Sequence, residues 1–407
     1  KGSKTGDDPR SVDPLLLSLA LAEGSSDGFR IYPAVIDLSI RNIAEAIQPL
    51  MDLPIPFVGH FIKAELFCLW KLSIQEPSEV WDTWVFEKLS HLGENHPKYA
   101  TERKSQGIDT IRAKEQSQAA DQFSCSLTAT CIRHGVNHRM ASSKTRLQQS
   151  FIHHTPGASF SNEQIEYAAE DAIAAAVLYP LQVQQALKIG ALNTLVSVEM
   201  PWTVTNARLE WSGFHVDAVK KQEVRDLVES NMPILEDQLA EMGIENARSH
   251  KQLSDFFSQQ GLIDHFMRDG GVTFDRDQLK RCQHLHPSVP LMRKLKRAGD
   301  LIADKIMGDD LVGADGRFHP QYRHLGTDTG RQTSQYPNIM GLDHLLRTLV
   351  VPQDGCGIGE ADWCQEEVGI AAAIYGDRNL ISMFNTGDVY SAMAQKFFQN
   401  TLTEEEQ

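Results

Sequence analysis

The pattern of apolar residues changes twice along this chain of 407 residues, and these changes constrain its fold most strongly. Up to about residue 188, short apolar runs that suit strands alternate with stretches of helical spacing, which predicts an α/β core. Helical spacing dominates residues 217–310, and strand and turn patterns return from residue 317. At roughly 100–200 residues per domain, this length suits two or three domains. We therefore predict a multidomain protein of the α/β and α+β classes, divided into residues 1–188, 189–316 and 317–407.

Local signals predict individual elements in the first part of the chain. Leu15–Ala22 and Phe29–Ile36 are apolar runs around a Gly/Ser/Asp turn, which is typical of a β-hairpin. Residues 94–122 are polar and irregular, which predicts an insertion or lid. Helical or strand patterns also predict the following elements: a helix over Ile40–Met51, a strand over Pro56–Gly59, a buried helix over Ile62–Leu72 and a long helix over Ser161–Leu187, opened by a capping box of Ser161 and Gln164.

Composition excludes several classes of protein. With 41% hydrophobic and 23% charged residues, the chain is neither disordered nor fibrous. No apolar run approaches the roughly 18–20 residues of a membrane-spanning helix, so we expect no membrane partner. The six cysteines form no Cys-x-x-Cys pair, which favours a reducing compartment and argues against a structural zinc site.

The distribution of charge points to one basic segment in an acidic chain. The net charge of −15 argues against a large nucleic-acid surface. Residues 281–350, however, hold ten Lys and Arg against seven Asp, a net charge of +3. Such a segment can bind phosphates, although random clustering on a solvated face explains it as well.

Tyr167 and Asp171 are one helical turn apart on an alanine-rich helix. A carboxylate on a packed helix is held rigidly, and a neighbouring tyrosine hydroxyl can orient a water molecule. Two-metal hydrolysis of phosphodiesters uses such a pair. The alternative is an aspartate on the solvated side of a structural helix.

Two further segments carry candidate site residues. Gly326–Asn338 combines glycines and small hydroxyl residues with Arg331, a composition that lets a backbone approach a DNA duplex or simply forms a polar turn. Cys356–Ala361 suggests a strand that ends at Asp362, and Glu366–Tyr375 suggests the helix that follows. A carboxylate between a strand end and a helix start is a common position for a catalytic metal ligand.

The first part of the chain resembles the DEDD-type 3′–5′ exonucleases. Ser161–Ala172 followed by Leu178 and Tyr179 is similar to the tyrosine form of their third motif, and Phe57–Glu65 with Val80–Thr83 is similar to the second. The resemblance implies a ribonuclease H-like fold for residues 1–188. It also implies that Glu65 and Asp171 ligate metal and that Tyr167 positions the attacking water.

This first resemblance has gaps. Phe61 stands where the family usually has Asn, and Glu65 stands where Asp is usual. The first motif, a strand with Asp-x-Glu, has no counterpart and should lie just before Lys1. We therefore expect the chain as given not to bind the metal pair properly or to cleave nucleic acid.

The rest of the chain resembles the family A DNA polymerases. Gly326–Asn338, Arg347 and Asp362–Glu367 follow the family's motif order, and Trp202–Asp217 is similar to the start of its polymerase domain. The resemblance implies template-directed DNA synthesis with Mg²⁺, or Mn²⁺ in its place. Its partners would be primer–template DNA and deoxynucleoside triphosphates. Residues 189–316 would form the palm start and helical thumb, and residues 317–407 the N-terminal part of the palm.

Individual roles follow from this second resemblance. Asp362 would ligate both catalytic metals, and Glu367 would be the steric gate against the ribose 2′-hydroxyl. Gln365 and Arg331 would contact the minor groove of the primer–template, and Asn338 would hold the segment that carries Arg331. Further DNA-binding residues would be Thr329 and Ser334 in that segment, and Arg293, Lys294, Lys296 and Arg297 in the thumb.

Other motifs of the polymerase family have no counterpart here. The fingers helix and the second metal-binding aspartate are absent, so the chain is expected to be a truncated and inactive piece of a bacterial or viral enzyme, located in the cytoplasm at the nucleoid. Thr333, Trp363, Cys364, Glu366 and Gly369 also depart from the usual motifs. Two alternatives remain: a ribonuclease D-like exonuclease with an unrelated second half, and a non-catalytic DNA-binding remnant. Host, oligomeric state, and a role in repair or replication stay open.

Overall fold

The fold is mixed α/β and rich in helices, and it forms two compact units, Lys1–Val351 and Pro352–Gln407. The computed structural model describes Arg10 and residues 14–25, 28–38, 43–92, 124–139, 143–155, 157–268, 270–309, 311–327 and 329–398. The insertion that we predict at 94–122 lies outside the described residues. These two units do not test the predicted division into three domains, residues 1–188, 189–316 and 317–407, and that division stays a prediction.

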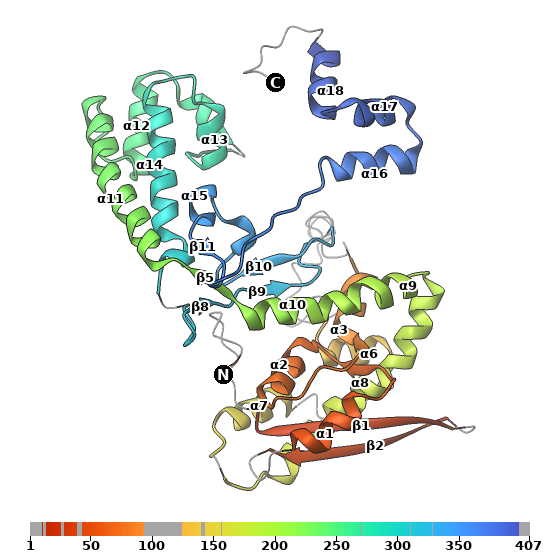
Figure 1. Cartoon of the computed structure of the whole chain (residues 1–407). Helices are drawn as coiled ribbons and strands as arrows, with labels where there is room; N and C mark the ends of the chain where they lie inside the picture. The colour runs from red at the N-terminus through yellow and green to blue at the C-terminus, as the bar shows by residue number, and fades with distance from the viewer. Residues whose placement is uncertain are drawn as a thin grey trace. The chain divides into compact units, whose positions relative to one another are not determined.

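The first part of the larger unit is built from strands and helices in alternation (Figure 1). Its elements are β1 (Leu16–Ser25), β2 (Gly28–Asp37), α1 (Ala44–Met51), β3 (Phe57–Gly59), α2 (Lys63–Lys71), β4 (Val80–Asp82), α3 (Thr83–Ser90), α6 (Leu127–Arg133), α7 (Lys144–Ile152) and α8 (Asn162–Lys188). The rest of this unit begins with α9 (Leu192–Thr194), a π-helical turn (Leu195–Glu199), α10 (Met200–Ser212) and β5 (Phe214–Val216).

The helical part of the larger unit and its last strands follow. They are α11 (Ala218–Glu241), α12 (His250–Gln259), β6 (Met267–Arg268), β7 (Gly271–Val272), α13 (Arg276–Arg281), α14 (Ser288–Ala303), β8 (Arg317–Phe318), β9 (Gln321–Arg323), β10 (Thr333–Gln335), α15 (His344–Arg347) and β11 (Val350–Val351), with 3₁₀ turns at Ile263–Phe266, Lys305–Met307 and Ile339–Gly341. The predicted helical dominance of residues 217–310 is confirmed.

Two strand pairs precede α8. The hairpin predicted near residues 15–36 is confirmed as β1 and β2, whose antiparallel register runs from Leu16 opposite Asp37 to Ser25 opposite Gly28. β3 and β4 form a parallel pair, and α8 packs against β1, β2 and β3. Since the described residues place these pairs in separate sheets, the ribonuclease H-like architecture stays a prediction.

α8 carries the predicted capping box. The Ser161 hydroxyl accepts a hydrogen bond from the Gln164 N–H at 3.3 Å, and the Gln164 side chain accepts one from the Ser161 N–H at 2.9 Å. These bonds satisfy two N–H groups that a helix start leaves unpaired. Pro180 lies inside the 27-residue helix, so the helix continues past it.

The turn after α10 leads into a small three-stranded sheet. Gly213 ends α10 with a φ of 63°, a left-handed conformation that favours glycine. β5 then pairs with β8 on one side and β11 on the other. Beyond this sheet, the long helices α11 and α14 pack together, and aromatic and aliphatic side chains of α11–α14 form their own core, including Leu239, Phe257 and Met292.

Residues 352–398, the described part of the smaller unit, contain three short helices: α16 (Glu366–Tyr375), α17 (Arg378–Thr386) and α18 (Val389–Phe398). α16 has the predicted bounds. The strand predicted over Cys356–Ala361 is wrong, because these residues are exposed and pair with no strand among the described residues. Two glycines within this stretch, Gly357 and Gly359, raise the entropic cost of an extended strand, and no neighbouring strand in the described part of the chain offsets that cost.

Along the described ranges, no helix combines the length and the apolar character that are needed to cross a lipid bilayer.

Candidate functional site

The structure brings the three residues of the exonuclease-like motifs into one cluster. Glu65 lies in the first turn of α2, and Tyr167 and Asp171 lie on neighbouring turns of α8. Tyr167 is 6% exposed, and burial, the charge of Asp171 and a hydrogen bond to Asp171 raise the pKa of its phenol. The phenol therefore stays protonated and acts as a hydrogen-bond donor.

Glu65 is in an unusual electrostatic environment for a metal ligand. Its side chain reaches solvent, but protein atoms crowd around the carboxyl group, and the resulting loss of hydration raises its pKa to about 8. The carboxylates of Asp82 and Asp171 add to this shift because like charges disfavour ionisation. At neutral pH the carboxyl group of Glu65 is mostly protonated.

His138 belongs to the same cluster, although no motif in the sequence predicts its position there. Its Nε2 lies 2.9 Å from Oδ1 of Asp171, and its side chain is 2% exposed. The buried Nδ1 of His138 has no hydrogen-bond partner within the described parts of the chain. One oxygen of Asp171 is therefore already bound to a ring nitrogen, and it is less available to a cation.

Asp82 stands beside this cluster and has a structural role. One carboxylate oxygen accepts hydrogen bonds from the N–H groups of Phe61 (2.8 Å) and Trp84 (2.9 Å), and the other accepts one from Ile62 (3.0 Å). Burial raises the pKa of Asp82, while these N–H donors oppose the shift. Asp82 thus fixes the starts of α2 and α3, including the left-handed φ of 64° at Phe61.

The arrangement does not fit the predicted metal pair. Among the described residues, no group of three or more His, Cys, Asp or Glu side chains is arranged to hold a metal ion. Mg²⁺ prefers ionised oxygen ligands in near-octahedral geometry, so a cation at Glu65 would have to displace the proton that this carboxyl group holds in the metal-free chain. Asp362, in the smaller unit, belongs to no such group among the described residues either.

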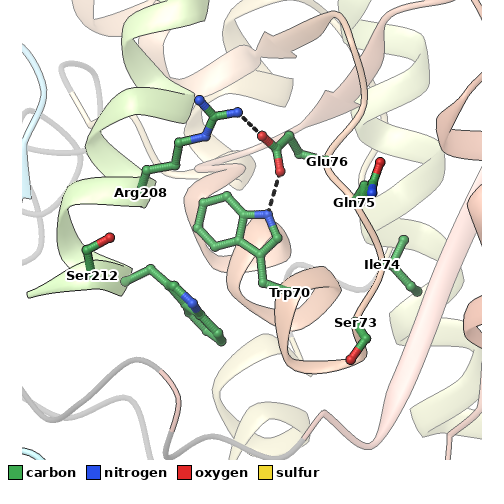
Figure 2. Close-up of a pocket in the computed structure, with 8 residues that line it drawn as sticks. Trp70, Ser73, Ile74, Gln75, Glu76, Arg208 and Ser212 are labelled. Carbon is green, nitrogen blue, oxygen red and sulfur yellow. Dashed lines mark hydrogen bonds and ion pairs between the residues drawn. The ribbon is translucent and has the colours of Figure 1, made fainter. Parts of the chain in front are cut away.

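An open cavity of about 340 Å³ lies between the end of α2 and α10 (Figure 2). Glu76 accepts a hydrogen bond from Trp70 Nε1 at 2.8 Å and pairs with Arg208. Burial opposes ionisation of Glu76, but the bonds from Arg208 and Trp70 outweigh it and lower its pKa. The charged groups of this cavity satisfy one another, so it contains no reactive side chain.

The segment Gly326–Asn338 is organised by its own side chains. The Asn338 carboxamide oxygen accepts hydrogen bonds from the Ser334 hydroxyl at 3.1 Å and from the Gly341 N–H at 3.3 Å. A Cβ at Gly326 would collide with the Thr333 hydroxyl, which explains the glycine by local packing. Thr329 and Arg331 are exposed on the preceding turn, where both can reach a ligand.

The predicted phosphate-binding residues of α14 differ in their surroundings. Arg297 donates two hydrogen bonds to Asp343, at 2.8 and 3.0 Å, and this contact lowers the pKa of Asp343. Arg293 donates to the Gln283 side chain. Lys294 is exposed, and its ammonium group makes no hydrogen bond or ion pair within the described residues.

The start of α16 holds the remaining predicted residues. Glu366 and Glu367 are exposed in its first turn, and Asp362 is exposed in the irregular segment before it. Gln365 donates a hydrogen bond to Asp388 at 2.7 Å and accepts one from the Val389 N–H at 2.9 Å. Gln365 thereby ties the start of α16 to the start of α18.

Comparison with known proteins shows a family resemblance in the second part of the chain. Residues 219–407 match the family model described as DNA polymerase family A. This part of the chain is therefore similar to DNA polymerase family A. The matched stretch contains α11–α18, and therefore the basic residues of α14, the Gly326–Asn338 segment and Asp362–Glu367.

Curated proteins that are similar to this chain are bacterial DNA polymerases I. The DNA polymerase I of Chloroflexus aurantiacus is 28% identical over 265 residues, which cover 59% of this chain and 28% of that protein. The Aquifex aeolicus enzyme is 27% identical over 280 residues, which cover 63% of this chain and 48% of that protein. The chain therefore spans roughly a quarter to a half of the length of these relatives.

A solved structure shares the fold of nearly the whole chain. It is the polymerase domain of Pol1 from M. smegmatis in complex with a DNA primer–template and dNTP. The superposition has a TM-score of 0.67 at 20% sequence identity, and it covers 97% of this chain and 66% of that chain.

Proposed function

We propose that this chain binds primer–template DNA as part of a protein that carries out template-directed DNA synthesis. The observation that carries the proposal is the family A match over residues 219–407. The similar M. smegmatis structure contains a primer–template and dNTP, which supports the same partners here.

Contacts to DNA would come from two places in the larger unit. Lys294 on α14 presents an ammonium group with no partner among the described residues, which is suited to a phosphate. Arg331 and Thr329 lie exposed on a turn that the Thr327 hydroxyl holds in shape, since it accepts a hydrogen bond from the Arg331 N–H at 2.9 Å and bonds to the Thr329 hydroxyl at 3.1 Å. The two residues would therefore meet the duplex at low entropic cost. Arg297 would have to exchange its two bonds to Asp343 for phosphate contacts, and Arg293 would have to give up its bond to Gln283.

In the smaller unit, Asp362 and Glu367 would act at the nucleotide. Asp362 is proposed as a metal ligand, a role that needs further ligands beyond those the described residues supply. Glu367 is proposed as the steric gate, which requires only its position in the first turn of α16. Gln365 would reach the minor groove only if its bonds to Asp388 and Val389 break.

The exonuclease-like cluster is proposed to be inactive in this chain, within a ribonuclease H-like domain. Three observations support this: Glu65 is mostly protonated at neutral pH in the metal-free chain, Asp171 is bound to His138, and no group of three or more His, Cys, Asp or Glu side chains among the described residues is arranged to hold a metal ion. Steady digestion of a labelled single strand in Mg²⁺ or Mn²⁺, lost on Asp171→Ala, would contradict this part of the proposal.

The binding proposal is tested by fluorescence anisotropy with a labelled primer–template. We expect the chain to bind the duplex without sequence preference, and the affinity to fall steeply as salt rises, because phosphate contacts release counterions. A scrambled duplex of equal length serves as the sequence control. Binding that does not depend on salt, or no binding at low salt, would overturn the proposal.

A further inference from the structure

The core of the helices α11–α14 is open on one side. A cavity of about 490 Å³ lies between α12, α13 and α14, and its floor is apolar. The floor is formed by Leu253, Phe274, Leu279, Met292 and Leu295, which also belong to the buried core of these helices. A volume of this size is in the range of pockets that bind small molecules.

A glycine on α14 leaves this space open. Met292, Leu295, Lys296 and Gly299 follow the i, i+3, i+4, i+7 spacing, so they share one face of the helix, and all four line the cavity. A Cβ at Gly299 would have no heavy atom within 4 Å. The apolar face of α14 therefore ends at a position without a side chain, and the cavity extends over it.

Two cationic side chains line the cavity, Lys296 and Arg248. The Lys296 ammonium is exposed and donates one long hydrogen bond, 3.4 Å, to the Phe274 carbonyl oxygen. No carboxylate of the described residues lies within ion-pair distance of it. Arg248 pairs with Glu236 at 3.3 Å, and Asp275, the acidic lining residue, pairs with Arg268 at 2.9 Å. Among the charged residues that line the cavity, Lys296 is therefore the one whose charge no ion pair offsets.

From this combination we infer that the cavity between α12, α13 and α14 is a binding site for a small apolar anion, such as a medium-chain aliphatic carboxylate. The apolar part would cover Leu253, Leu279 and Met292, and the carboxylate would meet the Lys296 ammonium. A strongly hydrated anion such as phosphate gains nothing from the apolar floor, because burial without hydrogen bonds costs it hydration. The inference does not depend on DNA binding or synthesis.

The test uses octanoate on the full chain, with anilinonaphthalene sulfonate as the fluorescent probe that octanoate displaces. Gly299→Phe places a ring in the cavity and should remove the displacement, whereas Gly299→Ala should keep it. Both substitutions replace a helix-interior glycine, so neither should lower the melting temperature. Lys296→Met should weaken octanoate by about tenfold, or about 1.4 kcal/mol. The same substitution should leave the affinity for 1-octanol unchanged. Lys251 does not line the cavity, so Lys251→Met should change the affinity for neither ligand.

Several results would overturn the inference. Octanoate could fail to displace the probe from the unmodified chain, or displace it equally from a folded Gly299→Phe variant. Equal affinities of octanoate and 1-octanol would show that the Lys296 ammonium does not bind the carboxylate. Displacement by inorganic phosphate or by a short DNA duplex, as effective as by octanoate, would indicate an anion site without apolar selectivity.

Discussion

His138 Nε2 lies 2.9 Å from Asp171 Oδ1, so a buried histidine occupies one oxygen of the carboxylate that the exonuclease-like motif supplies. The two residues are 33 positions apart, and Tyr167 binds the same carboxylate from the preceding turn of α8. Asp171 is therefore held by two side chains, and the carboxyl group of Glu65, which lies close to it, is mostly protonated at neutral pH. This cluster is built as a hydrogen-bonded network.

The first prediction concerns the pH dependence of stability. The folded-state pKa of Glu65 is about 8, above the ordinary value of 4.5, so between these values the folded chain binds more protons than the unfolded chain. The contribution of this carboxyl group to stability is therefore fully present below about pH 4.5 and falls as pH rises toward 8. We expect Glu65→Gln to match the unmodified chain near pH 4.5 and to be more stable than it near pH 8.

Urea unfolding at a series of pH values, with EDTA present, measures this effect. Glu163→Gln is the control, because the bond from Arg146 lowers the pKa of Glu163 and its titration lies below this window. If Glu65→Gln follows the unmodified chain at every pH, the crowded environment assigned to Glu65 is wrong.

The second prediction concerns the buried ion pair that joins α2 to α10. Lys63 Nζ lies 2.5 Å from Glu210 Oε1 and also donates to the Tyr322 carbonyl oxygen at 2.8 Å. Lys63→Met would leave the Glu210 carboxylate buried without its partner, which costs about 3–5 kcal/mol of stability. Lys63→Met/Glu210→Met should lose less than the sum of the two single variants, because no isolated charge remains.

Equilibrium denaturation of the two single variants and the double variant gives the coupling. Arg146→Met breaks an ion pair of similar length, 2.9 Å, whose side chains are 62% and 57% exposed. That control should leave the unfolding midpoint nearly unchanged, since exposed pairs are screened by water. Additive losses in the Lys63 series would mean that the pair contributes no coupling energy.

The third prediction concerns the turn that leads from α10 into β5. A Cβ at Gly213 would lie 2.6 Å from the Phe318 carbonyl oxygen and 2.8 Å from the His319 ring, and φ there is 63°. Gly190 has a φ of 72° but no neighbour within 4 Å. Gly190→Ala should cost only the left-handed strain of about 1–2 kcal/mol, and Gly213→Ala should cost clearly more. Thermal unfolding of both variants compares the losses, and equal losses would exclude the close contact.

Elements with local signals could be predicted from the sequence, and features that depend on distant partners could not. The capping box of α8 and the bounds of α16 follow from residues within one or two turns. The strand before Asp362 is predicted from a local pattern. A strand also needs a neighbouring strand to pair with, and the local pattern does not show whether one is present. The motif residues Glu65, Tyr167 and Asp171 do lie in one cluster, yet His138 comes from a distant segment.

The basic segment shows the same limit. Counting charges over residues 281–350 predicts phosphate binding for every Lys and Arg alike. Asp343 lies 46 positions from Arg297, and only the fold pairs the two side chains. Lys294, three residues away on α14, has no such partner among the described residues. Sequence reasoning therefore identifies the segment, while the fold distinguishes its members.

This distinction supplies the fourth prediction. Lys294→Ala should weaken binding of a primer–template duplex and reduce the slope of log affinity against log salt by about 0.9, which is the loss of one phosphate contact. Lys188→Ala, at the exposed end of α8, is the matched control and should leave the slope unchanged. Salt titrations by fluorescence anisotropy measure both, and an unchanged slope for Lys294→Ala would remove this residue from the DNA path.

The last prediction concerns the two glutamates that begin α16. Glu366 and Glu367 are both exposed in the first turn, and successive residues of a helix point about 100° apart. One of them can therefore face the sugar of an incoming nucleotide while the other faces away. In a polymerase that contains this sequence, as proposed above, Glu367→Ala should raise insertion of ribonucleotides relative to deoxyribonucleotides, because it would remove the side chain that is proposed to exclude the 2′-hydroxyl. Glu366→Ala is the matched control and should leave sugar selection unchanged. Single-nucleotide extension with dNTP and rNTP on one template measures both ratios. If Glu366→Ala relaxes the selection and Glu367→Ala does not, the motif is shifted by one residue, and the roles proposed for Asp362 and Gln365 must shift with it.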